Sequence, residues 1–149
     1  MPSRIWPLTI LLSLFLSLWG CGPAQDTFRV IEVIDGDTIV IEGGERVRYI
    51  GIDAPEMGPP PEPFAVEAWQ TNRELVEGKA VRLERDVSAT DRYGRLLCYV
   101  YVDATFVNAE LVRQGLARAR AYPPDTKYQE YLDKMETMAR RAGRGIWSK

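Results

Sequence analysis

Hydrophobic and polar residues alternate along the first half of the chain, which is typical of strands with one buried face. The segment FRVIEVI at 28–34 predicts a first strand, and Asp35-Gly36 ends it. Two further strands, DTIVIE and ERVRYIGI, surround Gly43-Gly44, which predicts a compact hairpin turn. The segment DAPEMGPPPEP that follows predicts a loop, because proline removes backbone donors and fixes φ.

The spacing of apolar residues changes to three and four after Phe64, which predicts a helix that ends at Gly78. The segments KAVRLERDV and LLCYVYV then predict a fourth and a fifth strand, with the polar loop SATDRYGR between them. The segment NAELVRQG predicts a short helix that Asn108 opens and Gly115 closes.

A last helix is predicted to open at Thr126, whose spacing to Gln129 fits a capping box. Its apolar stripe, predicted to pack on the core, consists of Tyr128, Tyr131, Leu132, Met135, Met138, Ala139 and Ala142. Three strands, a helix, two strands and two helices fit an α+β architecture. We therefore expect a five-stranded β-barrel of the OB-fold type with three helices packed against it.

The beginning of the chain has the pattern of an export signal. Arg4 precedes an uncharged, leucine-rich run that is shorter than a typical transmembrane helix. The segment LWGC follows this run and ends at Cys21. LWGC resembles the lipobox of bacterial lipoproteins, which predicts a lipoprotein signal at 1–20, lipidation of Cys21, a tether at 21–26 and the folded domain at 27–149. The alternatives are an ordinary cleaved signal or an uncleaved anchor.

Composition limits the chemistry that this chain can perform. Its 149 residues are enough for one domain and include no histidine, which excludes Ser–His and Cys–His nucleophilic sites and histidine metal ligands. Cys98 lies within an apolar strand and is expected to be a buried core residue. The net charge is −2, but residues 26–62 hold nine acidic and three basic side chains, whereas residues 111–149 hold four and nine. This asymmetry suggests a cation site beside an anion-binding face.

The predicted hairpin brings several carboxylates together at its open end. The turn folds Asp37 back beside Asp53, with Glu56 in the following loop, and such a cluster repels itself unless a cation intervenes. Calcium is the natural candidate because it accepts oxygen ligands in irregular geometry, with water and a substrate phosphate completing its shell. Arg48 lies between these acids in sequence; alternatively it is a surface residue paired with Glu42 or Glu45.

Several motifs in order along the chain carry a family resemblance. VIDGDTIVI, RVRYIGIDAPE, DRYGRLLCYVYV, VNAELVRQGLA and the closing GIW resemble the staphylococcal nuclease (thermonuclease) family over roughly residues 27–149. The resemblance implies that Asp37 and Asp53 are calcium ligands, and that Ala54 lends a backbone carbonyl where the family has a threonine.

The resemblance also assigns the residues that would handle the substrate. It implies that Glu56 lies beside the attacking water and that Arg48 and Arg95 bind phosphate. It further implies that Tyr93 contacts a phosphate of the bound nucleotide. The two base-packing tyrosines of the family are not cleanly reproduced, and Tyr122 is the nearby candidate.

The expected function follows from this resemblance. It implies a Ca²⁺-dependent endonuclease that hydrolyses phosphodiester bonds of single-stranded or denatured DNA and RNA with low sequence specificity and releases 3′-phosphate ends, and the signal-like segment at the start of the chain adds export. We expect a monomer on the cell envelope, held at the membrane by an N-terminal lipid anchor, or otherwise a secreted or periplasmic protein. The alternative is a non-catalytic OB-type module that binds nucleic acid or protein.

Overall fold

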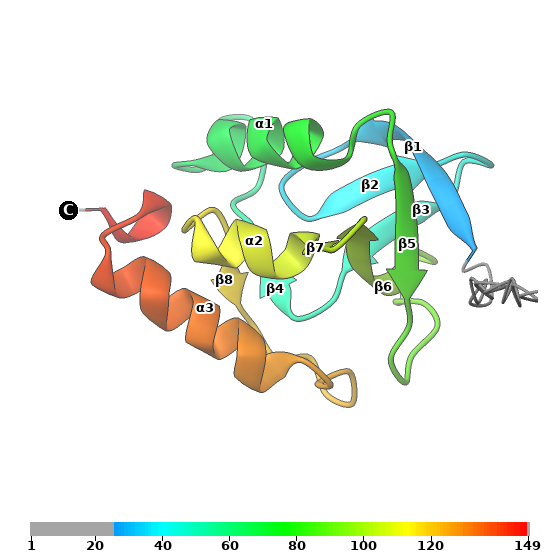
Figure 1. Cartoon of the computed structure of the whole chain (residues 1–149). Coiled ribbons are helices and arrows are strands. Elements are labelled where there is room, and N and C mark those ends of the chain that lie inside the picture. The colour runs from blue at the N-terminus through cyan, green and yellow to red at the C-terminus, as the bar shows by residue number, and fades with distance from the viewer. Residues whose placement is uncertain (1–25, 149) are drawn as a thin grey trace, which may run out of the picture.

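The computed structural model describes residues 26–148, so the expected signal at 1–20, the lipidation site Cys21 and nearly all of the tether at 21–26 lie outside the described residues. Within this part, four strands precede a first helix, three strands precede a second, and one short strand separates the second helix from the last (Figure 1). The elements are β1 (Thr27–Val33), β2 (Thr38–Ile41), β3 (Arg46–Tyr49), β4 (Ile52–Asp53), α1 (Ala65–Val76), β5 (Ala80–Glu84), β6 (Leu96–Val102), β7 (Thr105–Phe106), α2 (Val107–Arg113), β8 (Arg118–Ala119), α3 (Gln129–Arg141) and the 3₁₀ turn η1 (Gly145–Trp147).

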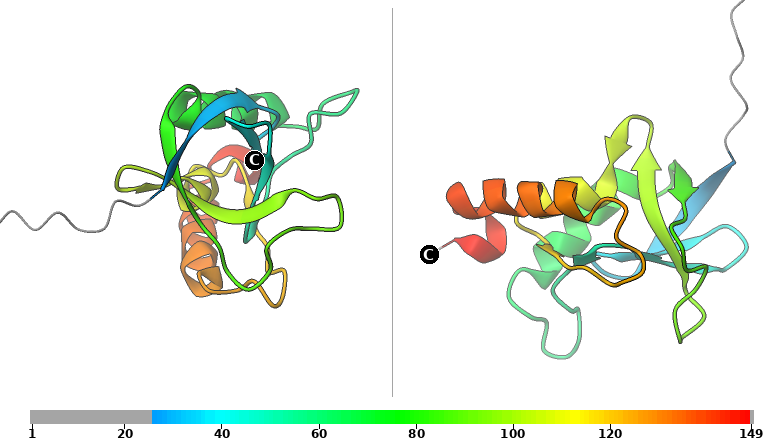
Figure 2. Two further views of the ribbon diagram at one scale, coloured as in Figure 1. Left: turned by 90° about the vertical axis from the view of Figure 1, so that its right-hand side faces the viewer. Right: turned by 90° about the horizontal axis from the view of Figure 1, so that it is seen from below.

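Five of the strands close into a barrel. The sheet runs in the order β3-β2-β1-β5-β6, and β6 then pairs in parallel with β3, so that Arg48 lies opposite Leu97. The left view of Figure 2 shows β1, β5 and β6 curving around a common centre. All other pairs of neighbouring barrel strands are antiparallel. This confirms the predicted five-stranded barrel with three helices.

The barrel is filled by the apolar residues that alternate along its strands. Val30, Ile39, Val47, Val81 and Val100 are all buried. Removing this apolar surface from water is the main contribution to the stability of such a domain.

α1 lies across one side of the barrel, and α2 and α3 pack against each other below it (Figure 1). The indole of Trp69 on α1 donates a hydrogen bond to the carbonyl of Val33 at 2.9 Å, which ties the helix to the end of β1. No helix among residues 26–148 has the length and hydrophobicity needed to cross a membrane.

The predicted start of the second helix is wrong. α2 begins at Val107, and Asn108 is fully buried instead of capping the helix. Its side-chain amide donates to the carbonyl of Ile50 at 2.8 Å, and its side-chain oxygen accepts from the amide of Val100 at 3.0 Å. Asn108 thus satisfies buried backbone groups of the barrel, a role that requires contacts far away in sequence.

The predicted start of the last helix is also wrong. α3 begins at Gln129 with no side-chain cap, and only the carbonyl of Thr126 bonds to the amide of Gln129. The residues just before the helix bond to the segment around β5: Lys127 donates its backbone amide to Asp86 at 2.9 Å, and the Tyr128 hydroxyl donates to Glu84 at 2.9 Å.

Candidate active site at the mouth of the β2–β3 hairpin

The hairpin register sets the position of the first acidic residue. Gly43 and Gly44 both have positive φ, and their turn pairs Thr38 with Arg48. The backbone amide of Tyr49 donates to the carbonyl of Asp37 at 2.9 Å, one step beyond that pair. Asp37 therefore lies beside the end of β3, as the sequence predicted.

The chain bends sharply after β3 and brings Asp53 to the same place. Gly51 has a φ of +77°, a conformation that residues with a Cβ rarely adopt. Arg48 and Asp53 are five positions apart, an odd offset that would point them to opposite faces of a regular strand. The bend at Gly51 removes this difficulty. Asp53 lies in the short strand β4, which pairs with β8.

Arg48 connects the two aspartates. Its guanidinium lies 3.1 Å from a carboxylate oxygen of Asp37 and 3.1 Å from one of Asp53, and its side chain is only 12% exposed. It also donates to the carbonyls of Tyr49 at 2.8 Å and Ile52 at 3.0 Å. The structure therefore replaces the alternative pairing of Arg48 with Glu42 or Glu45. A guanidinium held by this many acceptors has a fixed orientation.

Asp37 is the most buried of the acidic residues here. One of its carboxylate oxygens accepts from the amide of Ala54 at 2.8 Å, and the other accepts from the hydroxyl of Thr38 at 3.1 Å. Burial raises the pKa of Asp37 above its usual value, and the nearby charge of Arg48 opposes this shift. A cation next to this carboxylate would favour its ionised form.

The donor set is compatible with a calcium ion but does not enclose one. Asp37, Asp53 and the Ala54 carbonyl offer hard oxygen ligands, which Ca²⁺ prefers. Within residues 26–148, no three histidine, cysteine, aspartate or glutamate side chains lie together as a ready-made metal site. Such a partial set fits an open site whose remaining ligands come from water or substrate.

Glu56 lies on the loop beyond β4 and is exposed. Partial burial and the charge of Asp35 raise its pKa, and the charge of Arg48 lowers it. Its backbone amide donates to Glu62 at 2.9 Å. Glu56 therefore follows Asp53 in the loop, and the charges of Asp35, Arg48 and Asp53 all affect its pKa.

The second group of predicted residues, on the β5–β6 loop and in the segment before α3, meets Arg48 at a cavity. A cavity of about 450 Å³ is lined by residues that include Arg48, Tyr93, Arg95 and Tyr122. Tyr93 is 68% exposed and Tyr122 is 39% exposed, so both rings are accessible to a ligand. The cavity therefore brings together the two arginines and two tyrosines that the sequence singled out.

Sequence patterns did not single out two residues of this region, Asp91 and Arg120. The Asp91 carboxylate accepts from the amides of Tyr93 at 2.8 Å and Arg95 at 3.0 Å, and from Nε of Arg95 at 2.7 Å. Its spacing of four residues to Arg95 around Gly94 was the available signal. Arg120 donates to Asp53 at 2.8 Å from 67 positions away, and no local pattern indicates that contact.

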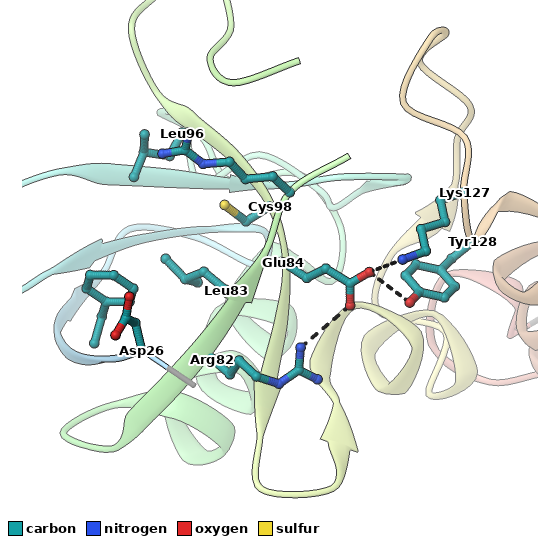
Figure 3. Close-up of a pocket in the computed structure, with 10 residues that line it drawn as sticks. Asp26, Arg82, Leu83, Glu84, Leu96, Cys98, Lys127 and Tyr128 are labelled. Atoms are coloured by element: carbon teal, nitrogen blue, oxygen red, sulfur yellow. Dashed lines mark hydrogen bonds and ion pairs between the residues drawn. The ribbon is translucent and has the colours of Figure 1, made fainter. Parts of the chain in front are cut away.

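A larger cavity of about 670 Å³ lies elsewhere, beside β5 and the start of α3 (Figure 3). The charged side chains that line it mostly pair with one another. Glu84 contacts Arg82 at 3.5 Å, forms an ion pair with Lys127 and accepts from Tyr128 at 2.9 Å. These pairs tie the barrel to the segment before α3. Because these charged side chains mostly pair with one another, the hairpin mouth is the better candidate for an active site.

The fold and this site define a class: a small closed barrel that gathers carboxylates and arginines beside an open cavity. A family comparison matches residues 46–149 to the family described as "Staphylococcal nuclease homologue". The chain belongs to this family, which confirms the resemblance seen in its motifs.

Several named proteins are similar in sequence to this chain over most of its length. "Thermonuclease" of Staphylococcus hyicus is 38% identical over 130 residues, covering 83% of this chain and 77% of the relative. "Thermonuclease" of Staphylococcus intermedius is 34% identical over 159 residues, covering 97% and 95%. "Endonuclease YncB" of Bacillus subtilis is 44% identical over 124 residues, covering 78% of this chain and 59% of the relative.

Proposed function

We propose that this protein is a Ca²⁺-dependent endonuclease that hydrolyses phosphodiester bonds in single-stranded or denatured DNA and RNA. The observation that carries the proposal is the position of Arg48, fixed 3.1 Å from both Asp37 and Asp53 and lining one cavity with Arg95. Its relatives named as thermonucleases and endonucleases support the same reaction class.

The cation site would use Asp37, Asp53 and the backbone carbonyl of Ala54. When bound, Ca²⁺ would supply positive charge to a phosphate oxygen and so favour attack at phosphorus. In this chain, burial of Asp37 and the hydrogen bond from the Ala54 amide hold that carboxylate in place before any ligand arrives.

Arg48 and Arg95 would bind the phosphate that reacts. A guanidinium offers a planar pair of donors that matches two phosphate oxygens. Donors fixed in advance stabilise the charge that grows on those oxygens in the transition state. Arg48 is fixed by the carbonyls of Tyr49 and Ile52, and Arg95 by Asp91. Both arginines therefore keep their orientation without the substrate.

Glu56 would orient the attacking water or accept its proton. Its exposed position leaves room for a water molecule, and its carboxylate has no competing side-chain donor among the hydrogen bonds of residues 26–148. Cleavage would then leave the phosphate on the 3′ end, as the family resemblance implies.

Tyr93 and Tyr122 would contact the nucleotide beside the reacting phosphate. Their exposed rings offer stacking surfaces, and stacking accepts every base. This arrangement supports cleavage with little sequence preference.

The decisive experiment compares cleavage of denatured DNA and of RNA by the purified chain with Ca²⁺ and with a chelator. We expect cleavage with Ca²⁺ only, and 3′-phosphate at the new ends. Arg46→Ala is the matched control for Arg48→Ala, because Arg46 lies on the same strand and faces solvent. Binding of nucleic acid without cleavage would favour the alternative, a non-catalytic binding module.

We also propose that the protein is exported and held at a membrane through a lipid on Cys21, and that it acts as a monomer. The leucine-rich run followed by LWGC supports export and lipidation. Mass spectrometry of the mature protein would detect the lipid, and an unmodified Cys21 would contradict that part. Light scattering of the purified protein would measure the oligomeric state.

A further inference from the structure

Arg120 holds an acidic residue of the proposed cation site. Nη1 of Arg120 lies 2.8 Å from one carboxylate oxygen of Asp53, and Nη2 of Arg48 lies 3.1 Å from the other. Both oxygens of Asp53 therefore have a guanidinium partner. The two partners differ in burial, since the Arg48 side chain is 12% exposed and the Arg120 side chain is 60% exposed.

The backbone of Arg120 is fixed although its side chain is exposed. β8 pairs with β4, with Arg118 opposite Asp53, and the amide of Arg120 donates to the carbonyl of Gly51 at 2.8 Å. The side chain thus starts from a constant position at the rim of the site. Its guanidinium can exchange partners within the reach of one arginine side chain.

The contact with Asp53 is suited to exchange. Exposed ion pairs are weak because water competes for both groups. A divalent cation bound to Asp53 would repel the guanidinium of Arg120 and compete with it for the same oxygen. Arg48, which the carbonyls of Tyr49 and Ile52 also hold, lacks this freedom.

Arg120 also lies beside the residues that would bind the substrate. Its guanidinium is 5.4 Å from the ring centroid of Tyr122, which lines the cavity shared by Arg48 and Arg95. Arg120 and Asp53 line a neighbouring cavity of about 510 Å³. A strand that extends past the first cavity would bring its next phosphate to Arg120.

We propose that Arg120 pairs with the carboxylate of Asp53 in the free protein and moves to a backbone phosphate of the substrate strand when the cation and the strand bind. Arg120 is then a third phosphate-binding arginine and also a competitor of the cation. This inference rests on the proposed nuclease function. It predicts opposite effects on two ligands. Removal of Arg120 should strengthen binding of the cation and weaken binding of the nucleic-acid strand.

The first test is a calorimetric titration of the purified chain with Ca²⁺ alone. Arg120→Ala should bind Ca²⁺ about two- to five-fold more tightly than the original protein, the range expected for loss of one exposed competing pair. Arg120→Lys keeps a positive charge near Asp53 and should fall between the two.

The second test measures binding of a short phosphorothioate DNA strand, which resists cleavage, across a range of salt concentrations with Ca²⁺ present. One lost phosphate contact should make the slope of log K against log salt less negative by about 0.7. Arg120→Ala should show this change, and Arg120→Lys should keep most of the original slope.

Arg113→Ala is the matched control. Arg113 pairs with Glu110 at 2.6 Å and is 39% exposed, so its removal also deletes one charge and one surface ion pair. It should leave both measurements unchanged. Unchanged Ca²⁺ affinity or an unchanged salt slope in Arg120→Ala would overturn the role of Arg120. Failure of the original protein to bind either ligand would overturn the proposed function itself.

Discussion

The carboxylate of Asp91 accepts a hydrogen bond of 2.7 Å from Nε of Arg95, across the turn that carries Tyr93. The same carboxylate accepts from the backbone amides of Tyr93 and Arg95, so one side chain orders the turn and aims the arginine. Burial alone would raise the pKa of Asp91, but the hydrogen bonds from Arg95 and the turn lower it overall.

Arg95→Ala should reduce kcat about 10³-fold if this guanidinium stabilises charge in the transition state, as other catalytic arginines do. Arg95→Lys should recover little, because an ammonium lacks the planar pair of donors. Steady-state kinetics on denatured DNA with Ca²⁺ measure both. A loss of only a few-fold, confined to KM, would make Arg95 a binding residue.

Asp91→Asn should lower kcat about 10- to 100-fold, since a misplaced catalytic group loses this much without being removed. The amide can still accept from the backbone of the turn but no longer pairs with the charge of Arg95. The double variant with Arg95→Ala should be no slower than Arg95→Ala alone, because both changes act through one group. Additive losses would show that Asp91 acts independently of Arg95.

The packing of α3 predicts a difference between two residues of one helix. Leu132 is fully buried, whereas Met138 is 49% exposed. Leu132→Ala should lower the free energy of unfolding by about 2–5 kcal/mol because it leaves a cavity. Met138→Ala should change it by less than about 0.5 kcal/mol. Denaturant titrations of both variants provide the comparison, and equal losses would contradict the observed packing.

The ion pair on α2 predicts a dependence of stability on pH. Hydrogen bonds from Arg113 lower the pKa of Glu110 below its usual value of 4.5. A lowered pKa in the folded state stabilises the protein above the usual value, and this contribution disappears as the pH falls through the lowered pKa. Its size is on the order of 1 kcal/mol or less, because the pair is partly solvated.

Glu110→Gln should therefore destabilise the protein at neutral pH and reduce the loss of stability between about pH 5 and pH 3. Thermal denaturation at several pH values measures this effect. Glu67→Gln, on the exposed side of α1, is the control and should follow the original curve. A Glu110→Gln curve that is parallel to the original at all pH values would show that the pair contributes nothing.

Local patterns predicted the strands well because each strand has one face in the core. The segment LLCYVYV coincides with β6, and the glycine pair produced the expected hairpin. The last helix was predicted less accurately. Of its predicted stripe, Leu132 is buried but Tyr131 and Met138 remain about half exposed, because α3 contacts the rest of the protein along a narrow line.

In the candidate site, too, local sequence patterns predict some contacts and miss others. The grouping of Asp37 with Asp53 could be predicted because a short hairpin connects them. The contact between Arg120 and Asp53 could not, since it depends on the pairing of β8 with β4. The role of Asn108 could not be predicted either, because its partners are Val100 in β6 and Ile50 in the turn after β3, which only the closed barrel brings near α2.

The parallel pairing of β3 with β6 has a consequence for how the family can diversify. Arg48 lies opposite Leu97 in the pairing of β3 with β6, and Arg95 is two residues before Leu97 in the chain. The separation of the two arginines is therefore set by backbone hydrogen bonds and not by the length of the chain between them. Insertions or deletions in that intervening stretch could reshape the surface around the cavity and leave the spacing of its two arginines intact.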